Sequence, residues 1–221
     1  MSNVTGTDAA VRGVFGRTVI VAGATGEAGH AVCAALVEAG ATVVAVGSNM
    51  NKLAGVRADH RFVCDLADLG AVEEFVRAVH QEVGSVDGLI HLIGGWRSGH
   101  TDRDWVWLEA RIMTTLRHTS AALRNDLGAS EAGRLAIVSS TAVDKPTWGN
   151  VNYATLKAAA ETWVTSIASA WAKLGNSAAV SFVVKALGEG EGFTPVEVLA
   201  ERVVSLWDAP AFVLNGQRIR V

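Results

Sequence analysis

The stretch RTVIVAGATGEAGHAVCAALVEAG, residues 17–40, decides the fold of this chain. Residues 17–23 form a short apolar run rich in β-branched side chains, which predicts a buried strand. In residues 27–39 the apolar side chains recur at helical spacing, and Gly40 provides a C-terminal cap for that helix. A buried strand that turns through glycines into a helix is the opening half of a strand–helix–strand unit, whose two strands lie parallel.

The same alternation of strand and helix continues along the chain. It predicts strands at 42–46, 61–64, 87–93, 134–139, 178–184 and 217–221, and helices at 68–83, 102–127, 152–174 and 194–207. The last helix is expected to begin with a capping box in Thr194-Pro195-Val196-Glu197, with the proline at the first helical position. Continuously apolar strands separated by helices are typical of a parallel sheet covered on both faces. We therefore expect an α/β fold, a Rossmann-type doubly wound sheet of about seven strands.

Length and composition fit one domain. The chain has 221 residues, 50% of them hydrophobic, and no linker, repeat or low-complexity segment divides it. A hydrophobic content of this size excludes a wholly disordered chain and fills a sizeable core. We expect residues 17–221 to form a single domain, preceded by a flexible polar extension at residues 1–16.

Charge and hydropathy exclude two classes of partner. The formal net charge is −3 and no basic block is present, so nucleic acid is not expected as a partner. No apolar run approaches the about 18 residues needed to span a bilayer, and the N-terminus lacks the charged and apolar regions of a signal peptide. We expect no membrane partner and a cytoplasmic protein.

The cysteines and histidines do not predict a metal site. Cys33 and Cys64 are 31 residues apart, which fits no zinc-binding spacing, and each lies in an apolar context. The six histidines form no HxxxH or HExxH pattern. We expect two reduced, buried thiols and no bound metal.

Three glycines mark the turn between the first predicted strand and the first predicted helix. In the pattern GxxGxxG, Gly23 permits a tight turn, Gly26 lets the backbone approach a pyrophosphate, and Gly29 lets helix and strand pack closely. The phosphates would bind the free backbone N–H groups at the start of the helix. In this position the pattern predicts a dinucleotide site, whereas alone it would be an ordinary glycine-rich turn. Glu27 belongs to the first helical turn, and we expect its side chain to point outward.

The end of the second predicted strand bears on the choice of dinucleotide. An acid there would accept the adenine-ribose hydroxyls of NAD, whereas basic or neutral polar residues suit the 2′-phosphate of NADP. The segment from Gly47 to Lys52 contains no acid, and Ser48, Asn49 and Lys52 could bind that phosphate. The sequence favours NADP over NAD.

One predicted helix carries a phenol and an ammonium group on the same face. Tyr153, the single tyrosine of the chain, precedes Lys157 by four residues, and Ser140 lies 13 residues before the tyrosine at the end of the fifth strand. A nearby cation lowers the pKa of a phenol, and an oxidised nicotinamide ring would add to that effect. All three side chains would meet at the carboxyl edge of the sheet, where α/β folds bind ligands. They predict proton transfer to or from a substrate oxygen, with an ordinary surface pair as the alternative reading.

The glycine turn, Asp65 after the third predicted strand, Ser140 and the Tyr153-x-x-x-Lys157 pair together resemble the short-chain dehydrogenase/reductase family, over about residues 17–221. The resemblance implies a Rossmann-fold NAD(P)-binding catalytic domain with Tyr153 as general acid/base. It also implies that Ser140 orients the carbonyl, that Lys157 binds the nicotinamide ribose and lowers the pKa of Tyr153, and that Asp65 lies near the adenine. With the glycine turn it gives the expected cofactor-binding set: Gly23, Thr25, Gly26, Glu27, Ala28, Gly29, Ser48, Asn49, Lys52, Asp65, Leu66, Ile93, Gly94, Gly95 and Lys157.

Several positions depart from the family pattern. Glu27 stands at the usual middle glycine of TGxxxGxG, and the usual NNAG is His91-Leu92-Ile93-Gly94. The asparagine of the following helix is absent, with Arg111 or a nearby threonine in its place, which leaves open what supports a proton relay. The glycine spacing, Gly94-Gly95-Trp96 and the late Thr194-Pro195 are similar to dihydropteridine reductase within the family. The missing acid after the second strand argues against an NADH enzyme of that type.

The substrate side is less defined. Trp96, Trp148 and Phe193 are expected to line a cleft for a flat or apolar substrate, and the glycine-rich segment 188–193 is either a lid or a plain connector. Trp163 and Trp171 lie eight apart on the helix that carries the tyrosine. In the family that helix often pairs with a partner subunit, so the resemblance implies a homodimer or homotetramer.

These features predict an NAD(P)-dependent oxidoreductase that transfers a hydride between nicotinamide and a carbonyl or hydroxyl group of a small molecule. Two alternatives stay open at this point. A cofactor-binding sensor or regulatory protein would need the glycine turn but not the Tyr153–Lys157 pair. An epimerase or dehydratase would use the same residues without net oxidation of the cofactor.

Overall fold

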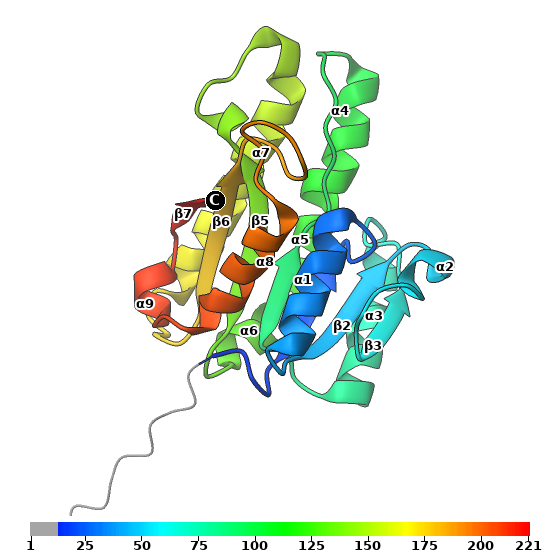
Figure 1. Cartoon of the computed structure of the whole chain (residues 1–221), viewed down its shortest axis with the longest axis vertical. Helices are drawn as coiled ribbons and strands as arrows, with labels where there is room; N and C mark the ends of the chain where they lie inside the picture. Colours follow the sequence, from blue (N-terminus) through cyan, green and yellow to red (C-terminus); the bar gives the residue numbers. More distant parts are fainter. Residues whose placement is uncertain (1–12) are drawn as a thin grey trace, which may run out of the picture.

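The computed structural model of the chain describes residues 13–221 and shows one parallel sheet (Figure 1). In this part of the chain seven strands lie in the order β3-β2-β1-β4-β5-β6-β7. They are β1 (Thr18–Ala22), β2 (Thr42–Gly47), β3 (His60–Val63), β4 (Gly88–His91), β5 (Arg134–Ser140), β6 (Ala178–Val184) and β7 (Arg218–Arg220). The strand order reverses between β1 and β4, which confirms the expected doubly wound α/β fold.

Burial along the strands follows their place in the sheet. β1 and β6 are buried at every residue, as expected for central strands covered on both faces. The edge strands β3 and β7 alternate between exposed and half-buried residues. The apolar runs therefore identified the central strands correctly, while the edge strands are short and less buried.

Helices cover both faces of the sheet (Figure 1). On one face, α1 (Glu27–Glu38) packs beside α8 (Val196–Val204) in one core cluster. On the other face, α3 (Leu69–Val83), α5 (Thr115–Ala122) and α7 (Val151–Trp171) share a second cluster. Short helices complete the described chain: α2 (Met50–Leu53), α4 (Asp102–Glu109), α6 (Arg124–Ala129) and α9 (Ala211–Leu214). None of the helices described is long and apolar enough to cross a membrane.

The segment expected as one helix at 102–127 is helical without a gap to Ala122, but it is not uniformly α-helical. A π-helical turn (Ala110–Thr114) lies between α4 and α5, and α6 follows after a break at Leu123. Where this turn meets α5, the Thr115 hydroxyl donates a 2.7 Å hydrogen bond to the Arg111 carbonyl. The apolar periodicity survives these interruptions, which is why the sequence alone indicated one helix.

The capping box expected at the start of the last helix is also wrong. Pro195 is the N-cap of α8 rather than its first helical residue, and no side chain of the described chain caps this helix. The Thr194 hydroxyl instead donates to the carbonyl oxygen of Val221, 2.9 Å away. The segment from Ser205 to Trp207 continues as a short 3₁₀ helix, so the expected end of the helical region is close to the observed one.

Residues 1–12 of the expected N-terminal extension lie outside the described residues. Within residues 13–16, Val14 is buried in the core and the N–H of Gly16 donates to the carbonyl oxygen of Gly40. These four residues contact the same domain as the helices and strands that follow them.

Candidate active site

The glycine turn between β1 and α1 has the geometry that its sequence predicts. Gly23 adopts a φ of +86°, a left-handed conformation that favours glycine. A Cβ atom on Gly29 would lie 2.6 Å from the carbonyl carbon of Ala24 and closer still to the Gly23 oxygen, so only glycine permits this approach. Gly26 is the N-cap of α1, and no described side chain caps it. The first backbone N–H groups of α1 are therefore available to an anion.

A first cavity, of about 510 Å³, opens beside this turn; we call it the turn cavity. Its wall includes eight of the expected cofactor-binding residues: Gly23, Thr25, Gly26, Ser48, Asp65, Leu66, Ile93 and Gly94. Arg111, which the sequence did not assign to the cofactor, lines it as well. The Arg111 and Arg97 guanidinium groups stack on the Trp107 ring at 4.0 and 3.9 Å, so cations stand beside this cavity.

A second cavity, of about 620 Å³, adjoins the first; we call it the central cavity. Leu92, Ile93 and Gly94 line both, so the two follow one another along the carboxyl end of β4. The central cavity also takes in the expected residues Ala28, Gly95, Trp96, Tyr153 and Lys157. Together the two cavities offer an elongated site with the glycine turn toward one end and the Tyr153–Lys157 pair at the other.

Four of the expected cofactor-binding residues do not line these cavities. Gly29 is buried in the contact between α1 and the turn, which is a packing role. The Asn49 side chain accepts the N–H of Lys52 and caps α2, and Lys52 itself is exposed. Glu27 is exposed, as expected, and its carboxylate lies on the side of Gly188. The structure therefore leaves Ser48 as the cavity-lining residue of the segment expected to bind a 2′-phosphate.

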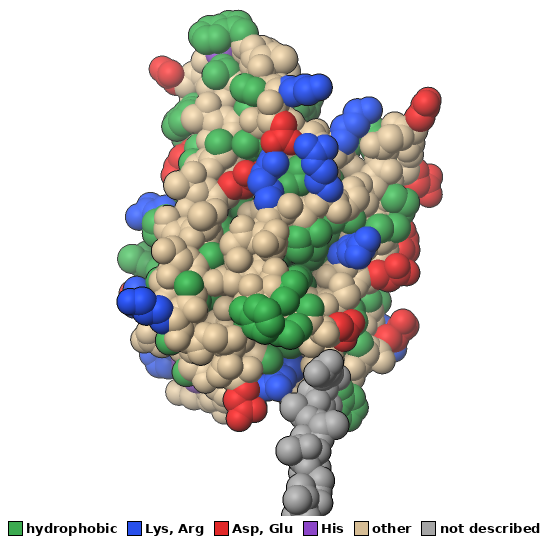
Figure 2. All heavy atoms as spheres, turned by 90° about the vertical axis from the view of Figure 1, so that its left-hand side faces the viewer, with side chains coloured by type: hydrophobic (Ala, Val, Ile, Leu, Met, Phe, Trp, Pro, Cys, Tyr) green, Lys and Arg blue, Asp and Glu red, His purple; other side chains and the backbone are tan. Residues whose placement is uncertain are grey.

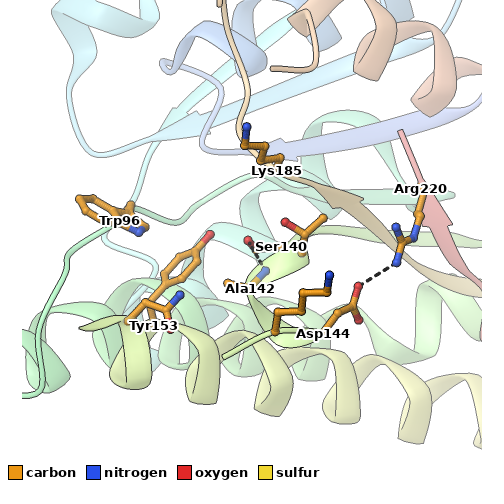
Figure 3. Close-up of a pocket in the computed structure, with 10 residues that line it drawn as sticks. Trp96, Ser140, Ala142, Asp144, Tyr153, Lys185 and Arg220 are labelled. Atoms are coloured by element: carbon orange, nitrogen blue, oxygen red, sulfur yellow. Dashed lines mark hydrogen bonds and ion pairs between the residues drawn. The ribbon is translucent and has the colours of Figure 1, made fainter. Parts of the chain in front are cut away.

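The three expected catalytic residues come together at the carboxyl edge of the sheet. Tyr153 and Lys157 lie on one face of α7, with the ammonium nitrogen 5.8 Å from the centroid of the phenol ring. Ser140 ends β5, and its Oγ accepts the N–H of Ala142 at 3.1 Å. The Ser140 hydroxyl is near enough to the phenol to lower its pKa, so the two hydroxyls are neighbours. Figure 3 shows both hydroxyls facing the same open space.

Burial dominates the electrostatics of this pair. Desolvation raises the pKa of Tyr153 above its ordinary value of 10.0, by more than the neighbouring Ser140 hydroxyl lowers it. Desolvation also lowers the pKa of Lys157 to about 8, with a smaller opposite effect of Glu161. The lysine ammonium donates a 2.6 Å hydrogen bond to the Val138 carbonyl. The net shift of the Tyr153 pKa is thus upward, opposite to the lowering that the resemblance implied.

A third cavity, of about 630 Å³, extends outward from the phenol; we call it the outer cavity. Its wall consists of Trp96, Ser140, Thr141, Ala142, Asp144, Lys145, Asn150, Tyr153, Lys185 and Arg220. Trp96, Tyr153 and Lys185 also line the central cavity, so the phenol stands at the junction of the two (Figure 3). A small molecule in the outer cavity would meet a ligand of the central cavity there.

Of the residues expected on the substrate side, only Trp96 lines a described cavity of the site. It is 65% exposed, so its ring is available for contact. Trp148 is more exposed still and stacks with the imidazole of His100, at 5.1 Å between ring centroids. Phe193 packs over Gly190 within the glycine-rich segment. Beside Trp96, the wall of the outer cavity carries charged side chains that the sequence analysis did not predict, namely Asp144, Lys145, Lys185 and Arg220.

Lys185, Lys145 and Arg220 are functional candidates that the sequence reasoning missed. A signal existed for Lys185, because it follows directly on the fully apolar strand predicted at 178–184, at the sheet edge where ligands bind. No comparable signal existed for Arg220. It reaches the cavity because β7 pairs with β6, and its guanidinium contacts Asp144 at 3.0 Å, 76 residues earlier in the chain.

His91 replaces the first asparagine of the family pattern and is a buried structural residue. Its Nε2 lies 3.0 Å from the Thr115 hydroxyl, which itself donates to the Arg111 carbonyl, so the imidazole donates to Thr115. Burial, and secondly the charge of Lys157, lower the pKa of His91 to about 3. The ring is therefore neutral near pH 7 and joins β4 to the start of α5.

The two cysteines are buried and free, as expected. Burial raises the pKa of Cys33 to about 12 and that of Cys64 to about 11, so both are protonated thiols near neutral pH.

The residues present fit a nicotinamide dinucleotide. The uncapped start of α1 offers backbone donors to a pyrophosphate, and the turn and central cavities run from there to the Tyr153–Lys157 pair. Gly94 leaves room beside the Lys157 ammonium, because a Cβ atom there would lie only 3.6 Å from it. The donor set is that of a dinucleotide site at the switch point of a doubly wound sheet.

Comparison with known proteins agrees with this geometry. The family model described as short chain dehydrogenase matches residues 17–188. A 2,3-dihydro-2,3-dihydroxybenzoate dehydrogenase of Bacillus subtilis is 28% identical over 161 residues, which are 67% of this chain and 62% of that protein. A 3-oxoacyl-[acyl-carrier-protein] reductase of Vibrio harveyi is 25% identical over 219 residues, 92% of this chain and 86% of the other.

Solved structures share the fold at lower identity. An NADPH-bound short chain oxidoreductase from Pseudomonas aeruginosa PAO1, described as containing an atypical catalytic center, has a TM-score of 0.85 at 18% identity, over 94% of this chain and 96% of that one. NAD⁺-bound xylitol dehydrogenase has a TM-score of 0.84 at 19% identity, over 94% and 98% of the two chains. With the family match over most of the chain, these findings establish that the protein belongs to the short-chain dehydrogenase/reductase family of NAD(P)-dependent oxidoreductases.

Proposed function

We propose that the protein transfers a hydride between a nicotinamide cofactor and the carbonyl or hydroxyl carbon of a small molecule, with Tyr153 as the general acid/base. The single observation that carries this proposal is the position of the phenol, which lies beside Ser140 at the junction of the central and outer cavities. When bound, the cofactor supplies or accepts the hydride. The chain's own residues bind the reactants and move the proton.

Tyr153 acts as the proton donor when a carbonyl group is reduced. Its raised pKa keeps the phenol protonated near neutral pH in the cofactor-free protein, which is the form a general acid needs. In the reverse direction the phenol must lose its proton. The positive charge of an oxidised nicotinamide and the ammonium of Lys157 then both favour the phenolate.

Ser140 positions the substrate oxygen. Its Oγ already accepts the backbone N–H of Ala142, so its own proton is free to be donated. A substrate oxygen between this hydroxyl and the phenol would receive two hydrogen bonds, which polarise a carbonyl group toward hydride attack.

Lys157 binds the cofactor. One of its three N–H donors is held by the Val138 carbonyl, which fixes the ammonium beside Gly94 in the central cavity. The remaining donors suit ribose hydroxyl groups. With its pKa at about 8, the group is mostly charged near neutral pH and can play this part.

NADP is the cofactor we propose. Ser48 lines the turn cavity where an NAD-selective enzyme of this fold would place an acid, and Arg111 adds a cation to the same wall. Asp65 is the acid of that cavity, and it accepts the N–H of Ala67 at 3.0 Å. A hydroxyl group and a cation in the wall of one cavity suit a phosphate better than a free diol.

We further propose a homodimer or homotetramer formed through α5 and α7. A mainly apolar surface hollow of about 240 Å³ lies between these helices, with Trp163, Ile167 and Trp171 in its wall. Light scattering coupled to size-exclusion chromatography gives the mass directly. A single-chain mass at micromolar concentration would contradict the proposed oligomer.

The experiment for the main proposal measures NADPH and NADH oxidation against a panel of aldehydes and ketones, with cofactor affinity determined separately. Cofactor-dependent reduction of at least one carbonyl compound supports the oxidoreductase. Tight cofactor binding with no turnover across the panel would instead support a sensor. Product formation without net cofactor oxidation would support an epimerase or dehydratase.

A further inference from the structure

Basic side chains surround the outer cavity. Lys145, Lys185 and Arg220 line it, and Asp144 is the one acid of its described wall. Figure 2, which looks onto the side of the molecule where β7 lies, shows Lys and Arg side chains gathered with a few acidic ones across its upper half. The whole chain is slightly acidic at −3, so this local excess of positive charge runs against the overall balance.

In the described chain, the arginines at and beside the outer cavity form ion pairs with acidic side chains, whereas the two lysines of its wall form none. Asp144 pairs with Arg220 at 3.0 Å and with Arg218 at 2.7 Å, and Arg218 also contacts Glu161 at 2.7 Å. Within residues 13–221, neither Lys145 nor Lys185 makes an ion pair or a side-chain hydrogen bond. The acid of the cavity is thus neutralised by arginine, and two ammonium groups remain without a counter-charge.

Of Lys145 and Lys185, Lys185 is the better placed to bind a molecule near Tyr153. It follows the last residue of β6 and lines both the outer and the central cavity, a property it shares only with Trp96 and Tyr153 among the described residues. A Cβ atom built on Gly192 would lie 3.3 Å from its Nζ, so the ammonium lies along the glycine-rich segment that follows. Figure 3 shows the Lys185 side chain across the open space from Ser140 and the Tyr153 hydroxyl, with its ammonium end turned away from them, so that it reaches an anion bound there by a change of side-chain rotamer.

From this arrangement we infer that the substrate carries an anionic group, a carboxylate or a phosphate, near its reacting carbonyl, and that Lys185 binds that group. The inference rests on the proposed hydride transfer at Tyr153. A free ammonium at the mouth of a cavity of about 630 Å³ attracts an anion and fixes which end of the molecule faces the phenol. Trp96, which lines both the outer and the central cavity, packs against the carbon skeleton of the bound substrate.

The first experiment compares carbonyl compounds with and without an anionic group on the same skeleton: phenylpyruvate against its methyl ester, and dihydroxyacetone phosphate against dihydroxyacetone. We expect kcat/KM to be higher for the charged member of at least one pair, and which pair responds distinguishes a carboxylate from a phosphate. Lys185→Gln should reduce that preference on the order of ten- to hundredfold, the value of one hydrogen bond to a charged group, mainly through KM. The neutral compounds should change little.

Lys173→Gln is the matched control, since Lys173 is exposed beyond the end of α7 and lines none of the described cavities. Equal losses in both lysine variants, or an unchanged preference in Lys185→Gln, would overturn the inference. A preference for the neutral member of both pairs would do so as well.

A second experiment separates this inference from the proposed function. The chain has five lysines, so reductive methylation with ¹³C labels gives few NMR signals, and Lys185→Gln assigns the one of interest. Titration with phenylpyruvate, with its ester and with inorganic phosphate should shift the Lys185 signal for an acid but not for the ester. No shift with either acid overturns the inference, whereas a shift without any turnover contradicts the proposed hydride transfer instead.

Discussion

The ammonium nitrogen of Lys157 lies 5.8 Å from the centroid of the Tyr153 ring and donates its short hydrogen bond to the Val138 carbonyl rather than to the phenol. The two groups come from one face of α7, yet burial has the larger effect on the pKa of each. Burial raises the pKa of the phenol and lowers that of the ammonium. The phenol is therefore protonated near neutral pH, and the proposed role in oxidation needs a further positive charge beside it to favour the phenolate.

Tyr153→Phe tests the acid/base role. Loss of the phenolic proton should lower kcat on the order of 10²- to 10⁴-fold, the usual contribution of a positioned general acid or base. Cofactor affinity should change little, because the phenol is not expected to hold the dinucleotide. Steady-state kinetics and fluorescence titration with NADPH measure the two quantities, and wild-type turnover in this variant would contradict the assignment.

Lys157→Met tests the buried ammonium through stability. The pKa of Lys157 is about 8 in the folded protein against 10.5 ordinarily, so between these pH values the unfolded chain binds the proton and the folded chain does not. The free energy of unfolding should therefore rise from pH 8 toward pH 10.5, by on the order of 3 kcal/mol for this group. Urea unfolding of the wild-type protein and of Lys157→Met from pH 7 to pH 10 measures this free energy. The variant should lack the rise with pH. An equal rise in the two proteins would contradict the effect of burial on Lys157. The same variant should bind NADPH more weakly.

Gly29→Ala tests the close contact in the turn. The added methyl group would overlap the backbone of Gly23 and Ala24, and such overpacking costs typically about 1–3 kcal/mol. Gly70→Ala in the first turn of α3 is the control, since its Cβ would meet the nearest atom, an Asp68 oxygen, at 3.4 Å, and alanine favours helix. Thermal unfolding compares them, and equal stability of the two variants would count against the packing role.

Ser48→Asp tests the cofactor preference. A carboxylate on this wall of the turn cavity would repel a 2′-phosphate and accept ribose hydroxyl groups. We expect the dissociation constant for NADPH to rise on the order of tenfold or more, while that for NADH falls or stays level. If NADPH and NADH bind the wild-type protein equally and the variant changes neither, Ser48 does not select the cofactor.

Much of this fold is visible in the sequence because each central strand is short, apolar and bounded by glycine or polar residues. The glycine turn and the Ser140–Tyr153–Lys157 spacing were equally readable, since each depends on positions close together in the chain. The π-helical turn at Ala110–Thr114 could not be predicted, because it leaves the apolar periodicity of the segment undisturbed.

The charged wall of the outer cavity could not be predicted from the sequence, for a different reason. Its charged wall combines the end of β5, the segment around Asp144, Lys185 after β6, and Arg220 on the edge strand β7. Only the pairing of β6 with β7 brings Arg220 to Asp144. From their positions in the sequence, Trp96 and Trp148 were both expected to line a cleft for a flat or apolar substrate, but Trp148 stacks with His100 and does not line the cavities of the site.

The most direct test of the account is the titration of Tyr153 itself. It is the single tyrosine of the chain, so the phenolate absorbance of the folded protein reports this group alone. Without cofactor, the pKa should lie above the ordinary value of 10.0, because burial raises it. With saturating oxidised cofactor it should fall well below that value, as the positive ring joins Lys157 in favouring the phenolate. A pKa that stays above 10.0 with oxidised cofactor bound would contradict Tyr153 as the acid/base of a hydride transfer.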